Sequence, residues 1–360
     1  MSDTTAQSEL AFVGTYTQRG SEGIYVYSVD ALSGRLLPLS HVGGIQNPSF
    51  LAAHPTRPLV YAVQETGADA AVMAFALDTA SNSLRPLNRQ PAHGSSPCHL
   101  SVDQTGKVVV VANYSSGTVS VYPVEEDGRL GEASQVIQHE GKSVNLKRQE
   151  GPHAHSATID PTNRFVFVAD LGLDRLMAYA LDPERAALTP LPELTVSVAP
   201  GAGPRHFAFH PTGPFAYLIN ELGNTIVAYS YDGGAGRLEE LQTMSTLPEG
   251  FAGTSHCADI HVSPSGRFVY GSNRGHDSLA IYAVDQGTGL LSFVAHTPTG
   301  GGNPRGFCIH PSGRWIWVGN QDTDTIVTFA VDEASGTLTA TGDVAEVSMP
   351  VCIRLTAGGC

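Results

Sequence analysis

Residues His210-Pro-Thr-Gly-Pro-Phe-Ala-Tyr-Leu-Ile-Asn220 contain the pattern that decides the fold. A turn with Pro and Gly leads into a run of apolar, β-branched and aromatic residues, which ends at a polar residue. Five further copies of this pattern begin at His54, Asp103, Asp160, Ser263 and His310. Successive starts are separated by 49, 57, 50, 53 and 47 residues. A period of this length made of short strands is typical of a β-propeller.

Each repeat predicts four antiparallel strands. In the copy around residue 210 the expected strands are 207–210, 215–219, 225–232 and 237–241. Apolar and polar residues alternate within these segments, and Gly, Pro, Asn and Asp separate them, as in antiparallel sheets. A long array of β-sandwich units is the alternative, but the regular spacing favours a closed ring.

The two ends of the chain supply the two parts of a seventh repeat. Residues 11–15 match the second strand of the repeat, and residues 350–355 match its first strand, as at 304–309. Pairing of the two ends would hide a sheet edge that otherwise invites aggregation. We therefore predict an all-β, seven-bladed β-propeller with four antiparallel strands per blade, closed by the C-terminal strand. It forms a single domain over residues 10–360, after a polar tail of residues 1–9.

Composition limits the classes of partner. The chain has 360 residues, a hydrophobic fraction of 41% and a formal net charge of −14. This acidity argues against non-specific binding to nucleic acid or to anionic membranes, and no long apolar run predicts a membrane span. Residues 1–9 do not resemble a signal peptide, and five scattered cysteines predict neither a disulfide framework nor a zinc site. We expect a cytoplasmic protein, as a monomer or weak homo-oligomer.

The repeat also predicts where a site can form. The first two strands of a blade run antiparallel, so the start of the first and the end of the second meet at one mouth of the axial channel. A purely structural repeat would place similar residues there in every blade, whereas these positions vary and collect ionisable groups. They include Glu65, His153, His155, Arg205, Glu221, His256, Arg274 and Arg305. Burying such groups costs free energy unless they pair or meet a ligand. We expect a site for a small anion; an ion-pair network that fills the channel is the alternative.

Individual candidates refine this prediction. Arg205 follows Gly-Ala-Gly-Pro, and its guanidinium fork suits a carboxylate or a phosphate as well as a salt bridge to Glu221. His153 and His155 would face one side of a strand, but no Asp or Glu is spaced to complete a metal site, so we expect no metal. The long segment 125–151 exceeds a turn, and such loops are often functional.

Six short motifs, in this order, carry a family resemblance. They are Phe12-Val-Gly-Thr-Tyr-Thr17, Gly151-Pro-His-Ala-His-Ser156, Val168-Ala-Asp-Leu-Gly-Leu-Asp174, Gly203-Pro-Arg-His206, Asn220-Glu221 and Ser272-Asn-Arg274. Over nearly the whole chain, the sequence resembles the seven-bladed lactonase family, which includes cycloisomerase-2-type 6-phosphogluconolactonases and the fungal carboxymuconate cyclase. The resemblance implies hydrolysis of 6-phosphogluconolactone to 6-phosphogluconate in the pentose phosphate pathway, with no cofactor and no required metal.

The resemblance also implies a set of site residues. The family's candidate catalytic histidine, two arginines and glutamate fall on His155, Arg205, Arg274 and Glu221. The expected substrate-binding residues around them are Arg305, His153, His206, His256 and Glu65. We expect His155 or Glu221 to activate a water, one arginine to stabilise the oxyanion, and another to hold the phosphate. Two alternatives remain open: cycloisomerisation of a carboxymuconate, and a non-catalytic propeller that binds protein partners.

Overall fold

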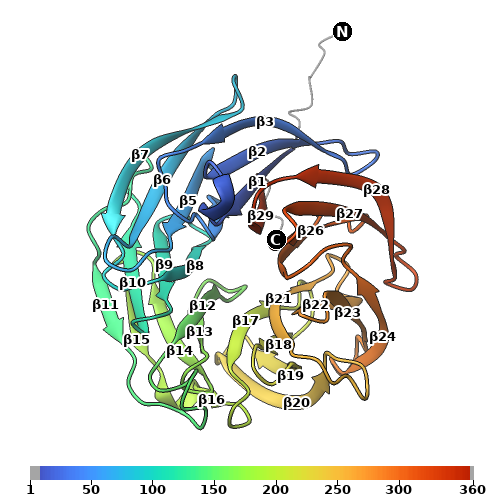
Figure 1. Cartoon of the computed structure of the whole chain (residues 1–360). Coiled ribbons are helices and arrows are strands. Elements are labelled where there is room, and N and C mark those ends of the chain that lie inside the picture. The colour runs from blue at the N-terminus through green and yellow to red at the C-terminus, as the bar shows by residue number, and fades with distance from the viewer. Residues whose placement is uncertain (1–8, 357–360) are drawn as a thin grey trace.

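The computed structural model describes residues 9–356 and forms a ring of seven antiparallel sheets, shown in Figure 1. The innermost strand of each sheet lies beside that of the next, and the fourth strand lies on the outside. The predicted seven-bladed propeller is thus confirmed. Residues 1–8 of the expected polar tail, and residues 357–360 of the expected domain, lie outside the described residues.

The first four blades use strands β1 to β16 and β29. Blade 1 consists of β29 (Pro350–Leu355), β1 (Leu10–Thr15), β2 (Ile24–Val29) and β3 (Leu36–Val42). Blade 2 consists of β4 (Leu51–Ala53), β5 (Leu59–Gln64), β6 (Ala71–Asp78) and β7 (Ser83–Pro91). Blade 3 consists of β8 (Pro97–Val102), β9 (Val108–Asn113), β10 (Thr118–Pro123) and β11 (Gln135–Gln138). Blade 4 consists of β12 (Ala154–Ile159), β13 (Phe165–Asp170), β14 (Arg175–Asp182), β15 (Ala187–Pro190) and the added β16 (Val196–Ser197).

The last three blades use strands β17 to β28. Blade 5 consists of β17 (Pro204–Phe209), β18 (Phe215–Asn220), β19 (Thr225–Asp232) and β20 (Arg237–Ser245). Blade 6 consists of β21 (His256–Val262), β22 (Phe268–Arg274), β23 (Ser278–Val284) and β24 (Leu291–Pro298). Blade 7 consists of β25 (Pro304–Ile309), β26 (Trp315–Asn320), β27 (Thr325–Val331) and β28 (Leu338–Glu346). Two short 3₁₀ turns, η1 (Gln18–Gly20) and η2 (Pro192–Leu194), complete the elements.

The ends of the chain close the ring as the repeat predicted. β29 pairs antiparallel with β1, with Ala11 opposite Leu355 and Val13 opposite Ile353. Both Val13 and Ile353 are fully buried in one apolar cluster with Trp317 of blade 7. The indole Nε1 of Trp317 donates a hydrogen bond to the Gly34 carbonyl oxygen of blade 1 at 2.6 Å. Packing between neighbouring sheets therefore forms the core and fixes the inner strands around the axis.

The repeated histidines hold the turns between the first and second strands. The Nδ1 atom of His54 accepts hydrogen bonds from the backbone N–H groups of Thr56 and Arg57 at 3.2 and 3.1 Å. In the next blade Asp103 takes this place, and its Oδ1 accepts from the backbone N–H groups of Lys107 and Val108. These side chains replace missing backbone partners in the turn, which supports their structural role.

The described cysteines lie inside the ring. Cys98, Cys257 and Cys352 are free and buried. No helix within residues 9–356 is long and apolar enough to cross a membrane.

Candidate active site

A β-bulge at the start of the innermost strands positions the side chains of the site. In blade 5, Pro204 is opposite Asn220 and His206 is opposite Ile219, so Arg205 is the extra residue that pairs with none. The same shift occurs at Cys98, His155, Arg305 and Val351. A β-bulge changes the direction in which the side chain of its extra residue points. The bulges therefore explain why one position of the repeat supplies the groups around the axis.

Glu221 is the centre of the first cluster of charges. It follows the last residue of β18 and is only 4% exposed. Its Oε1 lies 2.5 Å from Arg148 Nη2, and its Oε2 lies 2.9 Å from Arg274 Nη2 and 3.1 Å from Arg205 Nε. Burial alone would raise the pKa of Glu221, but Arg274 and Arg205 outweigh it and hold this pKa well below the ordinary value. Glu221 is therefore an ionised anchor for three guanidinium groups.

Arg205 is fixed by two of its nitrogens. In addition to the Nε contact with Glu221, its Nη1 donates to the carbonyl oxygen of Ala258 at 2.6 Å and lies 3.2 Å from His206 Nε2. Its Nη2 makes no hydrogen bond to the residues that the structure describes. Burial and the nearby Arg305 lower the pKa of Arg205, but an arginine remains charged in proteins.

His155 lies between a thiol and a carboxylate. Its Nδ1 is 3.8 Å from the Cys98 Sγ, and its Nε2 is 3.7 Å from Glu221 Oε2. Burial, followed by the charge of Arg205, lowers the pKa of His155 well below its ordinary value, so the imidazole is neutral near pH 7. Burial raises the pKa of the Cys98 thiol, which excludes a thiolate at this position near neutral pH.

Glu65 and Arg305 form a second group beside the first. The carboxylate of Glu65 accepts hydrogen bonds from the Ser49 hydroxyl and from the Tyr16 hydroxyl, the latter at 3.1 Å. The guanidinium carbon of Arg305 lies 5.3 Å from the ring centre of Tyr16. Arg305 makes no ion pair or side-chain hydrogen bond with the described residues. It is therefore a half-buried cation whose hydrogen-bond donors are free for a ligand.

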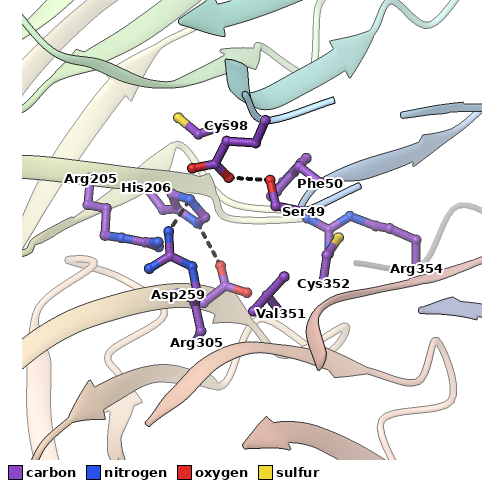
Figure 2. A pocket seen from close by; sticks show the side chains of 11 residues that line it. Ser49, Phe50, Cys98, Arg205, His206, Asp259, Arg305, Val351, Cys352 and Arg354 are labelled. Atoms are coloured by element: carbon purple, nitrogen blue, oxygen red, sulfur yellow. Dashed lines mark hydrogen bonds and ion pairs between the residues drawn. The ribbon is translucent and has the colours of Figure 1, made fainter. Parts of the chain in front are cut away.

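Two cavities meet at Glu65. The inner one has a volume of about 10 Å³, the size of a single water, and Arg205 and Arg305 converge on it (Figure 2). The outer one has a volume of about 540 Å³ and opens at the mouth of the channel. The polar residues that line it include Gln18, Gln46, Asn47, Glu65, Ser96 and Gln321. His155, Glu221 and Arg274 line neither cavity, and they lie beside Arg205, which lines the inner one.

The structure brings most of the predicted site residues together. His155, Arg205, Glu221 and Arg274 form one contact network, and His206 touches Arg205. Glu65 and Arg305 line the adjoining inner cavity.

Two predicted binding residues lie outside this network. The ring of His153 stacks on Tyr114 at 4.6 Å, and its Nδ1 donates to the Tyr114 carbonyl oxygen at 3.0 Å. His256 is paired with Arg274 in the strand ladder, and its Nδ1 is buried with no hydrogen-bond partner among residues 9–356. The structure thus shows His153 as a support for Tyr114. Across the described residues no group of three or more His, Cys, Asp or Glu side chains is arranged to hold a metal ion.

Sequence reasoning missed two residues of the network, Arg148 and Asp259. Arg148 belongs to the long segment 125–151, and its Nη2 contacts Tyr114 Oη at 3.3 Å as well as Glu221. The length of that segment was a signal, but nothing in it singled out Arg148. Asp259 follows the rim position Ala258 by one residue and binds His206 behind Arg205.

Comparisons with known proteins agree with the seven-bladed fold. The family model described as "Lactonase, 7-bladed beta-propeller" matches residues 10–355. A 6-phosphogluconolactonase of Bacillus subtilis is 39% identical over 345 residues, which cover 96% of this chain and 97% of that protein. A crystal structure of a protein from Bacteroides fragilis, proposed to be a 6-phosphogluconolactonase, has a TM-score of 0.92 at 38% identity and 99% coverage of both chains.

A further solved relative differs in its described substrate and location. The structure of a periplasmic gluconolactonase of Pseudomonas aeruginosa has a TM-score of 0.91 at 34% identity, covering 96% of this chain and 98% of that one. The family match, over residues 10–355, spans the seven blades and the segments that carry the charge network. On these grounds the chain belongs to the seven-bladed β-propeller lactonase family.

Proposed function

We propose that this protein hydrolyses 6-phospho-D-glucono-1,5-lactone to 6-phosphogluconate, the lactonase step of the pentose phosphate pathway. Relatives that match nearly the full chain carry the name 6-phosphogluconolactonase. We also propose that it acts in the cytoplasm as a monomer or a weak homo-oligomer. Cell fractionation and light scattering test these two points, and one solved relative is described as periplasmic.

The charge balance of the site is the observation that carries the proposal. Arg148, Arg205 and Arg274 surround the single carboxylate of Glu221. Arg305 adds a fourth cation near Glu65, without an ion pair to it. Arg354 and Asp259 line the same inner cavity. Five guanidinium groups against three carboxylates leave two positive charges, and a phosphate monoester carries about −1.5 to −2 at pH 7. A phosphorylated lactone would therefore neutralise the site.

The proposed base is His155. Glu221 is already held by three guanidinium groups, so its lone pairs are engaged and its affinity for a proton is low. His155 is neutral and can accept the proton of a water that attacks the lactone carbonyl; such a base contributes about 10²–10⁴-fold. Glu221, 3.7 Å from His155 Nε2, then stabilises the imidazolium that forms.

The proposed oxyanion donor is Arg205, and the proposed phosphate ligand is Arg305. Arg205 Nη2 is free while Nε and Nη1 are fixed, so it can donate to the carbonyl oxygen as negative charge develops there. Arg305 lines the same inner cavity and offers a fork of donors that matches phosphate oxygens. The polar outer cavity has the amide and hydroxyl groups that sugar hydroxyls require.

A substrate comparison tests the function. The purified protein is assayed with 6-phosphogluconolactone, with gluconolactone lacking the phosphate, and with carboxymuconate, each with product detection. Highest kcat/KM on the phosphorylated lactone supports the proposal. Equal or higher kcat/KM on gluconolactone would contradict the phosphate assignment, and turnover of carboxymuconate alone would point to cycloisomerisation.

Three variants test the residue assignment separately. His155→Ala, Arg205→Ala and Glu221→Gln are each expected to lower kcat/KM by about 10²-fold or more while the protein remains folded. Unchanged turnover in all three, with circular dichroism like that of the unaltered protein, would eliminate this site. That result would leave the substrate assignment standing.

A further inference from the structure

A buried carboxylate, that of Asp259, lines the inner cavity together with Arg205, and the proposal above gives it no role. Asp259 is 4% exposed and accepts four hydrogen bonds. Two come from side chains, His206 Nδ1 at 2.8 Å and His261 Nε2 at 3.1 Å. Two come from the backbone N–H groups of Ile260 and Phe307, at 3.0 and 3.3 Å. All of these partners are donors, so Asp259 is held as an ionised and fully bonded acceptor.

The β-bulge of blade 6 positions Asp259. In β21, Cys257 is opposite Asn273 and Ile260 is opposite Gly271, so Ala258 and Asp259 together face the single residue Ser272. Ala258 takes the rim position and supplies the carbonyl oxygen that binds Arg205 Nη1. The bulge frees the next side chain, Asp259, to reach the histidine of the neighbouring blade.

The contact with Asp259 fixes the proton of His206. A carboxylate only accepts, so His206 Nδ1 carries the hydrogen and Nε2 keeps its lone pair. Arg205 has only donors, and its Nη1 lies 3.2 Å from that lone pair. Figure 2 shows His206 between Asp259 and the guanidinium groups. The ionised Asp259 thus fixes the hydrogen of His206 on Nδ1. This leaves Nε2 of His206 as an acceptor for the donor Nη1 of Arg205.

The charge states of these residues agree with this arrangement. Burial and the nearby Arg205 lower the pKa of His206 to about 4, so the imidazole is neutral near pH 7. Burial alone would raise the pKa of Asp259. The interactions of its carboxylate with His261 and His206 outweigh the effect of burial and hold this pKa well below its ordinary value. A protonated His206 would present a second donor to Arg205 and repel it.

We propose that Asp259 and His206 are positioning residues that fix the guanidinium of Arg205 so that its Nη2 points at the substrate. Glu221 holds Nε, and His206 with the Ala258 carbonyl holds Nη1, so rotation of the guanidinium about its bond to the chain is blocked on two sides. Neither Asp259 nor His206 needs to touch the reacting atoms. This inference rests on the proposed lactonase function. It goes further by assigning a role to Asp259, which had none, and by giving His206 a positioning role in place of the expected substrate-binding role.

Matched histidine variants on the two sides of Asp259 test the inference. His206→Phe keeps a flat ring but removes the lone pair that Arg205 needs, whereas His206→Gln can restore an acceptor near the Nε2 position. His261→Phe removes the other side-chain donor to Asp259 and does not touch Arg205. We expect His206→Phe to lower kcat by about 10- to 100-fold with KM changed by less than about threefold. His206→Gln should recover most of this loss, and His261→Phe should keep kcat within about threefold.

A purely structural role predicts a different pattern. In that case His206→Phe and His261→Phe would lower the melting temperature alike and would change kcat alike, with no rescue by His206→Gln. That result would overturn the inference. If His206→Phe fails to fold, Asp259→Asn takes its place, with the same expected loss of kcat.

Nitrogen-15 NMR provides a readout that does not depend on activity. In the unaltered protein His206 should show a protonated Nδ1 and an unprotonated Nε2, and the Arg205 Nη signals should be separate because rotation is slow. In His206→Gln they should stay separate, and in Asp259→Asn they should merge. A protonated Nε2 would overturn the inference even if the enzyme is active. If no lactone is hydrolysed, the proposed function fails, and the NMR result still decides whether Arg205 is held in this way.

Discussion

Arg148 Nη2 lies 2.5 Å from Glu221 Oε1, although the two residues come from a long loop and from the end of an inner strand. The loop is held at both ends: His139 Nδ1 lies 2.6 Å from Asp170 Oδ2, and Gln149 Nε2 donates to Asp174 Oδ1 at 2.7 Å. The Arg148 side chain is 36% exposed, whereas that of Glu221 is 6% exposed. A fixed loop thus carries a partly exposed cation to a buried carboxylate.

We predict that Arg148→Ala raises KM for the phosphorylated lactone by about 10-fold and changes kcat by less than about threefold. Arg148 is the most exposed cation around Glu221, so it should contribute to binding equally before and during the reaction. Steady-state kinetics measure both constants. Lys147→Ala removes an exposed cation from the same loop without touching Glu221 and is the control. Equal effects of the two variants would contradict the prediction.

The buried histidines predict how stability depends on pH. Burial lowers the pKa values of His99, His155 and His206, the last from 6.5 to about 4. Below pH 6.5 the unfolded chain binds protons that the folded protein does not, so the free energy of unfolding falls as pH falls toward the folded pKa values. We expect a loss of up to about 1.4 kcal/mol per pH unit for each histidine.

Urea unfolding at pH 7.5, 6.5 and 5.5 measures this dependence. The window lies above the ordinary pKa values of carboxyl groups, whose contribution is lost only at lower pH. His206→Gln should reduce the slope below pH 6.5, whereas His93→Gln, at an exposed position, should not. Identical slopes for the two variants would show that burial of His206 does not cause the effect.

Two turn glycines provide a matched test of packing between blades. Gly106 and Gly313 occupy the same place in their repeats, with φ angles of +72° and +75°. A Cβ on Gly106 would collide with the His54 ring, whereas a Cβ on Gly313 would meet nothing within 4 Å. We expect Gly313→Ala to cost about 1 kcal/mol from backbone strain alone, and Gly106→Ala to cost about 2–4 kcal/mol. Denaturant unfolding measures both, and similar losses would refute the packing argument.

Closure of the ring predicts a large effect in the last strand. Ile353 is fully buried opposite Val13, whereas Val344 on the outer strand β28 is 53% exposed. We expect Ile353→Ala to lower the free energy of unfolding by about 2–4 kcal/mol and Val344→Ala by less than about 0.5 kcal/mol. Comparable small losses in both, measured by urea unfolding, would mean that β29 adds little to the fold.

Strand order and closure could be predicted because each repeat contains its own turns and its own alternation of apolar residues. The strand expected at 225–232 is observed as β19 (Thr225–Asp232), and the end of the chain completes blade 1 as expected. The position of Arg205 and Glu221 at one mouth also followed from antiparallel pairing. These features depend on local sequence, which every copy repeats.

The missed features depend on contacts between distant segments. Arg148 reaches Glu221 only because side chains of blade 4 hold the loop, and the loop sequence does not encode those anchors. Asp259 entered the network through a bulge, and a bulge is visible only once the strand register is known. His153 had the correct residue type near the mouth, but its ring packs against Tyr114.

The pairing of β29 with β1 also delays the completion of blade 1 while the chain is being synthesised. Ala11 finds its neighbour Leu355 only after all of the residues between them have been synthesised. At about 5–20 residues per second, the first blade waits roughly 20 to 70 seconds on the ribosome with one edge open. During that time its exposed backbone groups are available to other nascent strands. Chaperone demand in the cell should therefore be greatest just before β29 emerges from the ribosome.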